Sequence, residues 1–281
     1  MIATAVSFDQ LAGYSDFLRQ RDRSTGTIEQ YVRDVGAFLR FLDGRFLTSE
    51  HPAAWKAHLL HQGFAPATVN AMLSALNGFF VFLGREDCRV PFLKLQRRVF
   101  RDPGKELSRK EYEHLFRTAM RQGRERLALV METICATGIR VSETAYITVE
   151  AARRGRAEVS LKGKIRTILI PRQLAQKLLS YARAKKIVSG EIFLTKNGRS
   201  LSRRQIWYEM KQLCAAAGVE ASKVFPHNLR HLFAVVFYQA SRDIVRLADI
   251  LGHSSIETTR IYLVTSGEEH ARQLEQLKLI F

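Results

Sequence analysis

Residues 85–105 interrupt the hydrophobic pattern of this chain and determine how it can divide into domains. The stretch has more basic than acidic side chains and contains the turn-forming pair Pro103 and Gly104. Turn residues combined with a basic bias are typical of a linker. A chain of 281 residues is long enough for two domains. We therefore expect one domain over residues 1–84, a basic linker over 85–105 and a second domain over 106–281.

The first domain is predicted to consist of four helices. Apolar residues recur at helical spacing in four segments, and the second of these carries Ile28, Val35 and Phe38 on one stripe. The first segment opens with a capping-box pattern, SFDQ at residues 7–10. The fourth begins at Pro66, a residue that suits the first turn of a helix. No constellation of residues in these segments suggests catalysis.

The second domain is predicted to be mainly α, with a small antiparallel β-sheet. Helical patterns begin at Ser108 and near residue 124, and the second of them ends at Gly138; a helix restarts at Ser142. Residues 157–171 change to the alternating period of a β-hairpin, and residues 192–194 offer a third strand. Further helices are expected at roughly residues 172–187, 202–217, 227–240 and 243–251.

The charge of the chain indicates a polyanionic partner. Lys and Arg number 44 against 27 Asp and Glu, a formal net charge of +17 at pH 7. A strongly basic protein of this kind is typical of nucleic-acid binding. A membrane partner is not expected, because no apolar run approaches the ~20 residues of a spanning helix. The start of the chain lacks a secretory pattern, and Cys88, Cys135 and Cys214 match no metal spacing, so we expect reduced thiols and a cytoplasmic location.

The last quarter of the chain carries residues suited to phosphoryl transfer. His227 and Arg230 are three positions apart after Pro226, and a helix opened by that proline would place both on one face. His253 and Tyr262 follow. Arg binds phosphate as a planar fork, His accepts a proton near neutral pH, and Tyr is a covalent nucleophile. These residues predict transfer through a phosphotyrosine. The same stretch, residues 247–262, also reads as a helix-turn-helix that binds DNA without catalysis.

The sequences of these motifs resemble those of the tyrosine recombinase (integrase) family, and most of all those of its compact Xer-type members. The resemblance rests on HNLR at residues 227–230, LGH at 251–253, Tyr262, and Arg140 within ATGIRVSE at 136–143. It implies the DNA breaking-rejoining fold, with a helical core-binding domain before the catalytic domain. For the first domain, an oligomerisation bundle is the alternative. The resemblance further implies double-stranded DNA with core recombination sites as partner, and a homo- or hetero-tetramer on that DNA.

The chemistry assigns a role to each candidate residue. Tyr262 is the predicted nucleophile, and Arg140 and Arg230 are the donors that neutralise the phosphate. On the family's pattern, His227 is the base or proton relay and His253 a hydrogen-bond donor. The family's general acid is a lysine in a hairpin, which the Lys-Gly pattern places on Lys162, with Lys164 as the competitor. We expect His231 to be structural, Tyr238 to pack, and Glu143 to orient Arg140.

No cofactor or metal is expected, because a phosphotyrosine bond keeps the energy of the broken phosphodiester. Two other functions stay open. A type IB topoisomerase shares the nucleophile and the cationic site, and a helix-turn-helix regulator would bind DNA without cutting it.

A tail helix over residues 267–281 has an apolar face at Leu274, Leu277 and Ile280. Because so short a helix is marginal alone, it must dock on its own domain or on a neighbouring protomer. On DNA in the cytoplasm, the protein would be nucleoid-associated.

Overall fold

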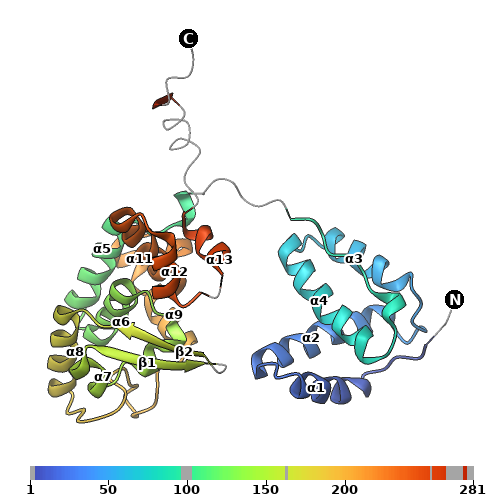
Figure 1. The fold of residues 1–281 in the computed structure, drawn as a ribbon, viewed down its shortest axis with the longest axis horizontal. Coiled ribbons are helices and arrows are strands. Elements are labelled where there is room, and N and C mark those ends of the chain that lie inside the picture. Colours follow the sequence, from blue (N-terminus) through green and yellow to red (C-terminus); the bar gives the residue numbers. More distant parts are fainter. Residues whose placement is uncertain (1–3, 96–102, 162–163, 254, 264–274, 277–281) are drawn as a thin grey trace. The chain divides into compact units, whose positions relative to one another are not determined.

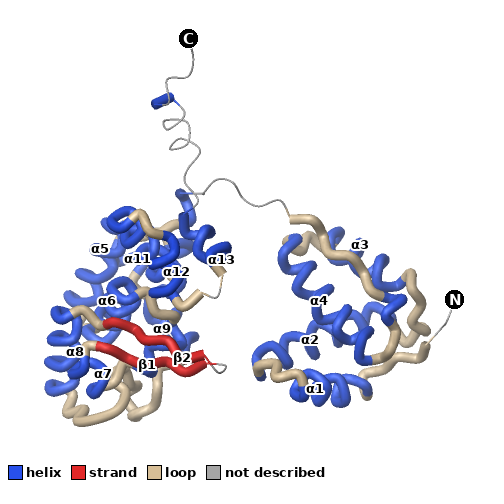
Figure 2. Tube along the Cα trace, in the orientation of Figure 1, coloured by secondary structure: helices blue, strands red, loops and turns tan. Residues whose placement is uncertain are grey.

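The computed structural model describes residues 4–95, 103–161, 164–253, 255–263 and 275–276 (Figure 1). The chain forms two compact units, Met1–Arg97 and Arg98–Phe281. The described residues are mostly helical, with one small antiparallel sheet (Figure 2). The predicted fold class is therefore confirmed. Where the domains end and the linker begins stays a prediction, and the predicted tail helix lies almost wholly outside the described residues. Among the described residues, no helix is both long enough and apolar enough to cross a membrane.

The N-terminal unit contains the four predicted helices: α1 (Gln10–Gln20), α2 (Thr25–Leu42), α3 (His51–His61) and α4 (Pro66–Phe82). The Ser24 side chain accepts a hydrogen bond from the Thr27 amide at the start of α2. The capping box predicted at residues 7–10 is only half formed. The Ser7 amide donates to Gln10 Oε1 at 3.1 Å, but the helix begins after Asp9 and no side chain caps it in return.

Residues 85–95, at the start of the predicted linker, pack on the N-terminal unit. The side-chain amide of Asn77 on α4 bonds both backbone groups of Val90, at 2.9 and 3.0 Å. Asn70, two turns earlier on α4, bonds Leu93 in the same way. Two amide side chains therefore satisfy an extended backbone that has no sheet partner among the described residues.

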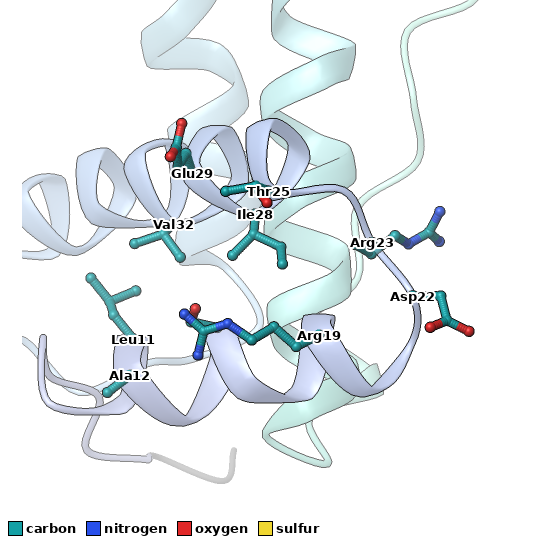
Figure 3. Close-up of a pocket in the computed structure, with 10 residues that line it drawn as sticks. Leu11, Ala12, Arg19, Asp22, Arg23, Thr25, Ile28, Glu29 and Val32 are labelled. Carbon is teal, nitrogen blue, oxygen red and sulfur yellow. The ribbon is translucent and has the colours of Figure 1, made fainter. Parts of the chain in front are cut away.

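A hollow of about 630 Å³ lies between α1 and α2. Figure 3 shows apolar side chains such as Leu11, Ile28 and Val32 on its walls, with Arg19 and Glu29 beside them. The hollow lies in the N-terminal unit, whereas the candidate catalytic residues all come from the C-terminal unit.

The C-terminal unit begins with η2 (Pro103–Lys105) and continues with these elements: α5 (Arg109–Arg121), α6 (Glu125–Thr137), η3 (Val141–Tyr146), α7 (Val149–Arg154), β1 (Arg156–Leu161), β2 (Lys164–Leu169), α8 (Arg172–Ala184), α9 (Arg203–Lys211), α10 (Cys214–Ala217), η4 (Ala221–Lys223), α11 (Pro226–Ser241), α12 (Ile244–Leu251), α13 (Ile256–Arg260) and η5 (Ile261–Leu263). The helix expected from Ser108 is confirmed as α5, and it opens with a capping box in which Ser108 and Glu111 bond each other's backbone amides. The helix expected from Ser142 is the short 3-10 helix η3. The helix expected at 202–217 is interrupted after Lys211, and its second part, α10, ends at Gly218.

The sheet of the described residues has two strands, β1 and β2, paired antiparallel with Val159 opposite Arg166. The third strand predicted at residues 192–194 is wrong. Glu191 forms a single bridge to Thr148, and Leu194 a single bridge to Ser200, so neither pairing extends into a ladder. Ile192 and Phe193 are fully buried in the core, which explains the apolar run that suggested a strand.

Helix α11 positions the candidate site because it packs against α6 and meets α12 and η5 (Figure 1). Pro226 occupies its first turn, as the sequence predicted. The core of this unit is built mainly from α5, α6, α7, α8 and the inner face of the hairpin, and α9, α10 and α11 also contribute to it. A smaller apolar cluster joins Ala234 of α11, Leu247 and Leu251 of α12, and Tyr262. The C-terminal helices are thus fixed to one another around the tyrosine.

Candidate active site

Arg140 is held in a fixed loop between α6 and η3. Gly138 ends α6 in the left-handed conformation, with φ +65°. A Cβ at this glycine would lie 2.4 Å from the Phe233 ring, so the close packing of α11 excludes a side chain there. The Arg140 amide donates to Glu143 Oε2 at 2.7 Å, and its Nη1 to Glu143 Oε1 at 3.1 Å. The Arg140 side chain keeps 42% of its surface exposed, whereas Glu143 is buried. The carboxylate therefore orients a guanidinium that still faces solvent, as predicted for Glu143.

Arg230 is buried, and its guanidinium is fixed by three contacts. Nη1 donates to the carbonyl of Gly138 at 2.5 Å, and Nη2 donates to the carbonyl of Leu251 at 2.8 Å. Nη2 also lies 2.9 Å from His253 Nε2. Burial, together with the nearby charge of Arg140, lowers the pKa of Arg230 to about 10. The group remains a cation at neutral pH.

His253 follows Gly252, which ends α12 in the left-handed conformation. Its Nδ1 lies 2.9 Å from the hydroxyl of Thr259, a buried residue of α13. Burial and the charges of Arg230 and Arg140 lower the pKa of His253 to about 4. The ring is therefore neutral at pH 7, with Nε2 facing a donor of Arg230 and Nδ1 facing the threonine hydroxyl.

The Tyr262 ring lies among three histidines. Its centroid is 5.8 Å from that of His253, in a nearly parallel stack, and 5.9 Å from that of His227. His231 is nearer, at 5.2 Å. Tyr262 is buried, with 5% of its surface exposed. The structure thus brings together four residues that the sequence singled out: His227, Arg230, His253 and Tyr262.

The two histidines on α11 differ in their surroundings. Burial lowers the pKa of His227, and the charge of Arg230 lowers it further, so that ring is neutral at pH 7 and able to accept a proton. His231 Nε2 lies 3.2 Å from a carboxylate oxygen of Glu106. A histidine beside a carboxylate in this way is consistent with the structural role expected for His231. The packing role expected for Tyr238 fits its place beside the small cluster around Tyr262.

Arg166 is a residue of this site that sequence reasoning missed. It lies on β2, and its Nη1 donates to the carbonyl of Leu251 at 2.5 Å and to Glu143 Oε1 at 3.4 Å. The alternation of β2 was a usable signal, because Arg166 falls on the same face as the buried Ile168. Thr259 was also missed, and nothing in the sequence marks it as the partner of His253.

Neither candidate lysine of the hairpin has a described side chain. Lys162 lies outside the described residues, and of Lys164 the structure describes only the backbone, at the start of β2. The choice between the two lysines therefore stays a prediction. So do the chemical roles of the other five candidate residues, whose positions alone are now known.

Comparison with known proteins identifies the family. Residues 105–269 match the phage integrase family, and residues 11–87 match the N-terminal SAM-like domain of phage integrases. The chain belongs to the phage integrase family. It is 30% identical to tyrosine recombinase XerA of Thermococcus kodakarensis, over 95% of this chain and 94% of the relative. It is 32% identical to tyrosine recombinase XerC of Roseiflexus castenholzii, over 86% of this chain and 84% of the relative. The resemblance noted in the sequence is confirmed.

The fold is that of lambda integrase. The dimer of that protein bound to a COC′ core site has a TM-score of 0.71 with this chain, at 19% identity, covering 92% of this chain and 77% of the other. Its tetramer bound to a Holliday junction has a TM-score of 0.69, at the same identity and coverage. At this identity the likeness establishes the fold alone.

Proposed function

We propose that the protein is a site-specific DNA recombinase that cleaves and rejoins strands through a 3′-phosphotyrosine intermediate. The observation that carries the proposal is the arrangement of Tyr262 against His227 and His253, with the buried Arg230 bonded to His253. A nucleophile, a neutral base and a fixed cation meet at one place. The two named relatives are tyrosine recombinases, and this chain aligns with 94% and 84% of their lengths, which supports the same function.

The proposed cleavage step forms one bond to phosphorus and breaks another. Tyr262 Oη attacks the scissile phosphorus and forms the phosphotyrosine bond, while the bond from phosphorus to the 5′ oxygen breaks. His227 takes the tyrosine proton, because its lowered pKa keeps the ring neutral. Arg140 and Arg230 neutralise the non-bridging oxygens. The 5′ oxygen leaves with a proton from the hairpin lysine, Lys162 or Lys164. Rejoining is the reverse step with a 5′-hydroxyl from a partner strand.

His253 supports this step through Arg230 rather than through proton transfer. Its pKa of about 4 leaves it neutral over the working range of pH. Because Thr259 and Arg230 face its two ring nitrogens, the ring is locked in one orientation. In this arrangement Nε2 accepts from Arg230 and orients it, whereas the donor role that the family resemblance implied would require a proton on Nε2.

Double-stranded DNA with core recombination sites is the proposed partner. The net charge of +17 supports it. So does the outer face of α9, where Trp207 and Tyr208 are exposed and Lys211 Nζ lies 5.3 Å from the Trp207 ring centroid. The cations on such a face can pair with the phosphates of a duplex. Arg203 on the same helix lowers the pKa of His227, which places this face close to the candidate active site.

We further propose that the chain acts in a DNA-bound tetramer, in which strands are cut and exchanged in pairs. The lambda integrase tetramer on a Holliday junction supports this assembly for a protein of the same fold. Such a complex on chromosomal or mobile DNA would place the protein in the cytoplasm, in association with the nucleoid. The tail over residues 267–281 stays a candidate for the contact between protomers.

The test begins with the target DNA. Duplexes with two inverted half-sites of randomised sequence are selected by binding to the protein. The sequence that binds most tightly is called the selected duplex. Two copies are then placed on one supercoiled plasmid. A recombinase gives resolved or inverted products that depend on both copies. Relaxation of a plasmid without the selected duplex would show topoisomerase activity instead. Tight binding with neither product nor covalent adduct would show a non-catalytic regulator, and either result would overturn the proposal.

A further inference from the structure

Arg166 is a largely buried cation that the cleavage step above does not use. It lies on β2 opposite Val159, and 12% of its side-chain surface is exposed. Its strand neighbour Ile165 is exposed, whereas Ile168, two positions along, is buried. The alternation of the strand therefore turns Arg166 into the domain. A buried guanidinium is costly unless it is paired, so its partners indicate its task.

Each partner of Arg166 also holds one of the two arginines assigned to the phosphate. Glu143 Oε1 accepts from Arg166 Nη1 at 3.4 Å and from Arg140 Nη1 at 3.1 Å. The carbonyl of Leu251 accepts from Arg166 Nη1 at 2.5 Å and from Arg230 Nη2 at 2.8 Å. One nitrogen of Arg166 thus stands between the Arg140 loop and the end of α12.

The turn that carries His253 is built over the Arg166 side chain. A Cβ at Gly252 would lie 2.3 Å from Arg166 Cδ and 3.0 Å from its Nη1. Gly252 also has φ +63°, which disfavours a side chain on its own account. The close approach means that a shift of Arg166 would be transmitted to His253, the next residue.

The donors of Arg166 are enclosed by the protein. Its Nε and Nη2 atoms are buried and have no hydrogen-bond partner among the residues that the structure describes. With its third nitrogen engaged by Leu251 and Glu143, the guanidinium presents no donor to a phosphate on the surface. A role in the reaction must therefore act through other residues.

We propose that Arg166 is a positioning residue that fixes the spacing of Arg140 and Arg230 and keeps Arg140 available to the phosphate. The inference rests on the proposed function. With Arg140 as its only cationic partner, the Glu143 carboxylate would hold that guanidinium more tightly. Arg166 takes up part of the carboxylate charge, and its bond to Leu251 ties the same carboxylate to the carbonyl that fixes Arg230.

The test compares two substrates in single-turnover adduct formation. One is the selected duplex, and the other carries a methylphosphonate at the scissile position, which has no negative charge to neutralise. Arg166→Met should lower the rate on the phosphate roughly 10- to 100-fold, the scale for residues behind the first contact layer. The methylphosphonate should lose less than about threefold, because the arginine pair matters less there. Arg166→Lys, which keeps a cation, should recover part of the rate and serves if the Met variant does not fold.

A double-mutant cycle with Glu143→Gln provides the second measurement. Because Arg166 acts through Glu143, the two losses should not multiply in the double variant. Equal losses on both substrates, or losses that multiply, would reduce Arg166 to a residue of general structural support. Where the methylphosphonate is cut too slowly to measure, the cycle decides. Absence of any adduct with the parent protein on the selected duplex would overturn the proposed function, and this inference with it.

Discussion

The two arginines assigned to the phosphate are held in different ways. The Arg230 guanidinium is buried, and backbone carbonyls at the C-terminal ends of α6 and α12 fix it. Arg140 is half exposed and is oriented by a single carboxylate. Preorganised donors stabilise a transition state without reorganising, and Arg230 fits that description more closely. Its burial also makes it part of the fold, so substitutions of the two arginines should have distinguishable effects.

Arg140→Ala should lower cleavage of the selected duplex by about 100- to 1000-fold, the scale for loss of one transition-state donor. Its stability should change little, because Glu143 keeps Arg166 as a partner. Arg230→Ala should lose cleavage to a similar degree and about 1 to 3 kcal/mol of stability as well, because the buried Gly138 carbonyl loses its side-chain donor. Adduct rates and urea unfolding of both variants test this. Full cleavage by Arg140→Ala would show that Arg140 does not stabilise the transition state and at most anchors the phosphate of the bound DNA.

His253 should make the stability of the protein depend on pH. The folded pKa of about 4 lies below the 6.5 of a free histidine, so unfolding takes up a proton between these values. Stability should therefore be complete above pH 6.5 and fall as the pH drops toward 4. The loss from pH 7 to pH 5 should be at most about 2 kcal/mol, since solvent screens part of the effect. In His253→Gln this contribution should vanish from urea unfolding curves; an unchanged pH dependence would contradict the assignment.

Helices α6 and α11 owe their close approach to a glycine. The left-handed turn at Gly138 places Arg140, and its backbone lies against Phe233 of α11. Gly218 ends α10 with nearly the same φ, +64°, but a Cβ added there would have no described atom within 4 Å beyond its chain neighbours. The two glycines therefore separate the cost of backbone strain from the cost of collision.

Gly218→Ala should destabilise the protein by about 1 to 2 kcal/mol, the cost of a left-handed residue with a side chain. Gly138→Ala adds the collision with Phe233 and should cost a further 1 to 3 kcal/mol, roughly the penalty for overpacking a core. Cleavage should fall in Gly138→Ala alone, because only that turn positions Arg140. Thermal unfolding and adduct assays of the pair test this. Equal destabilisation by the two substitutions would show that α11 shifts to make room for the added methyl group.

The two candidates for the general acid, Lys162 and Lys164, belong to the hairpin between β1 and β2. A selected duplex with a 5′-bridging phosphorothiolate has a leaving group that needs no proton. It should rescue the variant that lacks the acid, which we predict to be Lys162→Ala, and it should leave the loss in Arg140→Ala unchanged. Adduct formation by Lys162→Ala and Lys164→Ala on both duplexes decides the matter. Rescue of Lys164→Ala, with Lys162→Ala nearly normal on ordinary DNA, would move the role by two residues.

Across the molecule, the sequence predicts the helical architecture well because amphipathic spacing and helix caps are local. The sequence motifs also single out His227, Arg230, His253 and Tyr262, whose side chains lie near one another in the structure. What sequence reasoning missed depends on tertiary contacts. Arg166 meets Glu143 and Leu251 only after the hairpin folds against α12, and the buried run at Ile192 and Phe193 looks the same in a strand as in a loop.

Covalent attachment of Tyr262 to DNA, on which the proposed function depends, can be measured with a nicked form of the selected duplex. Loss of the short fragment beside the nick traps the intermediate, and the adduct is digested and mapped by mass spectrometry. We predict a 3′-phosphotyrosine on the peptide that contains Tyr262. We also predict no adduct in Tyr262→Phe, with binding of the duplex nearly unchanged. An adduct that persists in Tyr262→Phe, or one that maps to another residue, would show that Tyr262 is not the nucleophile.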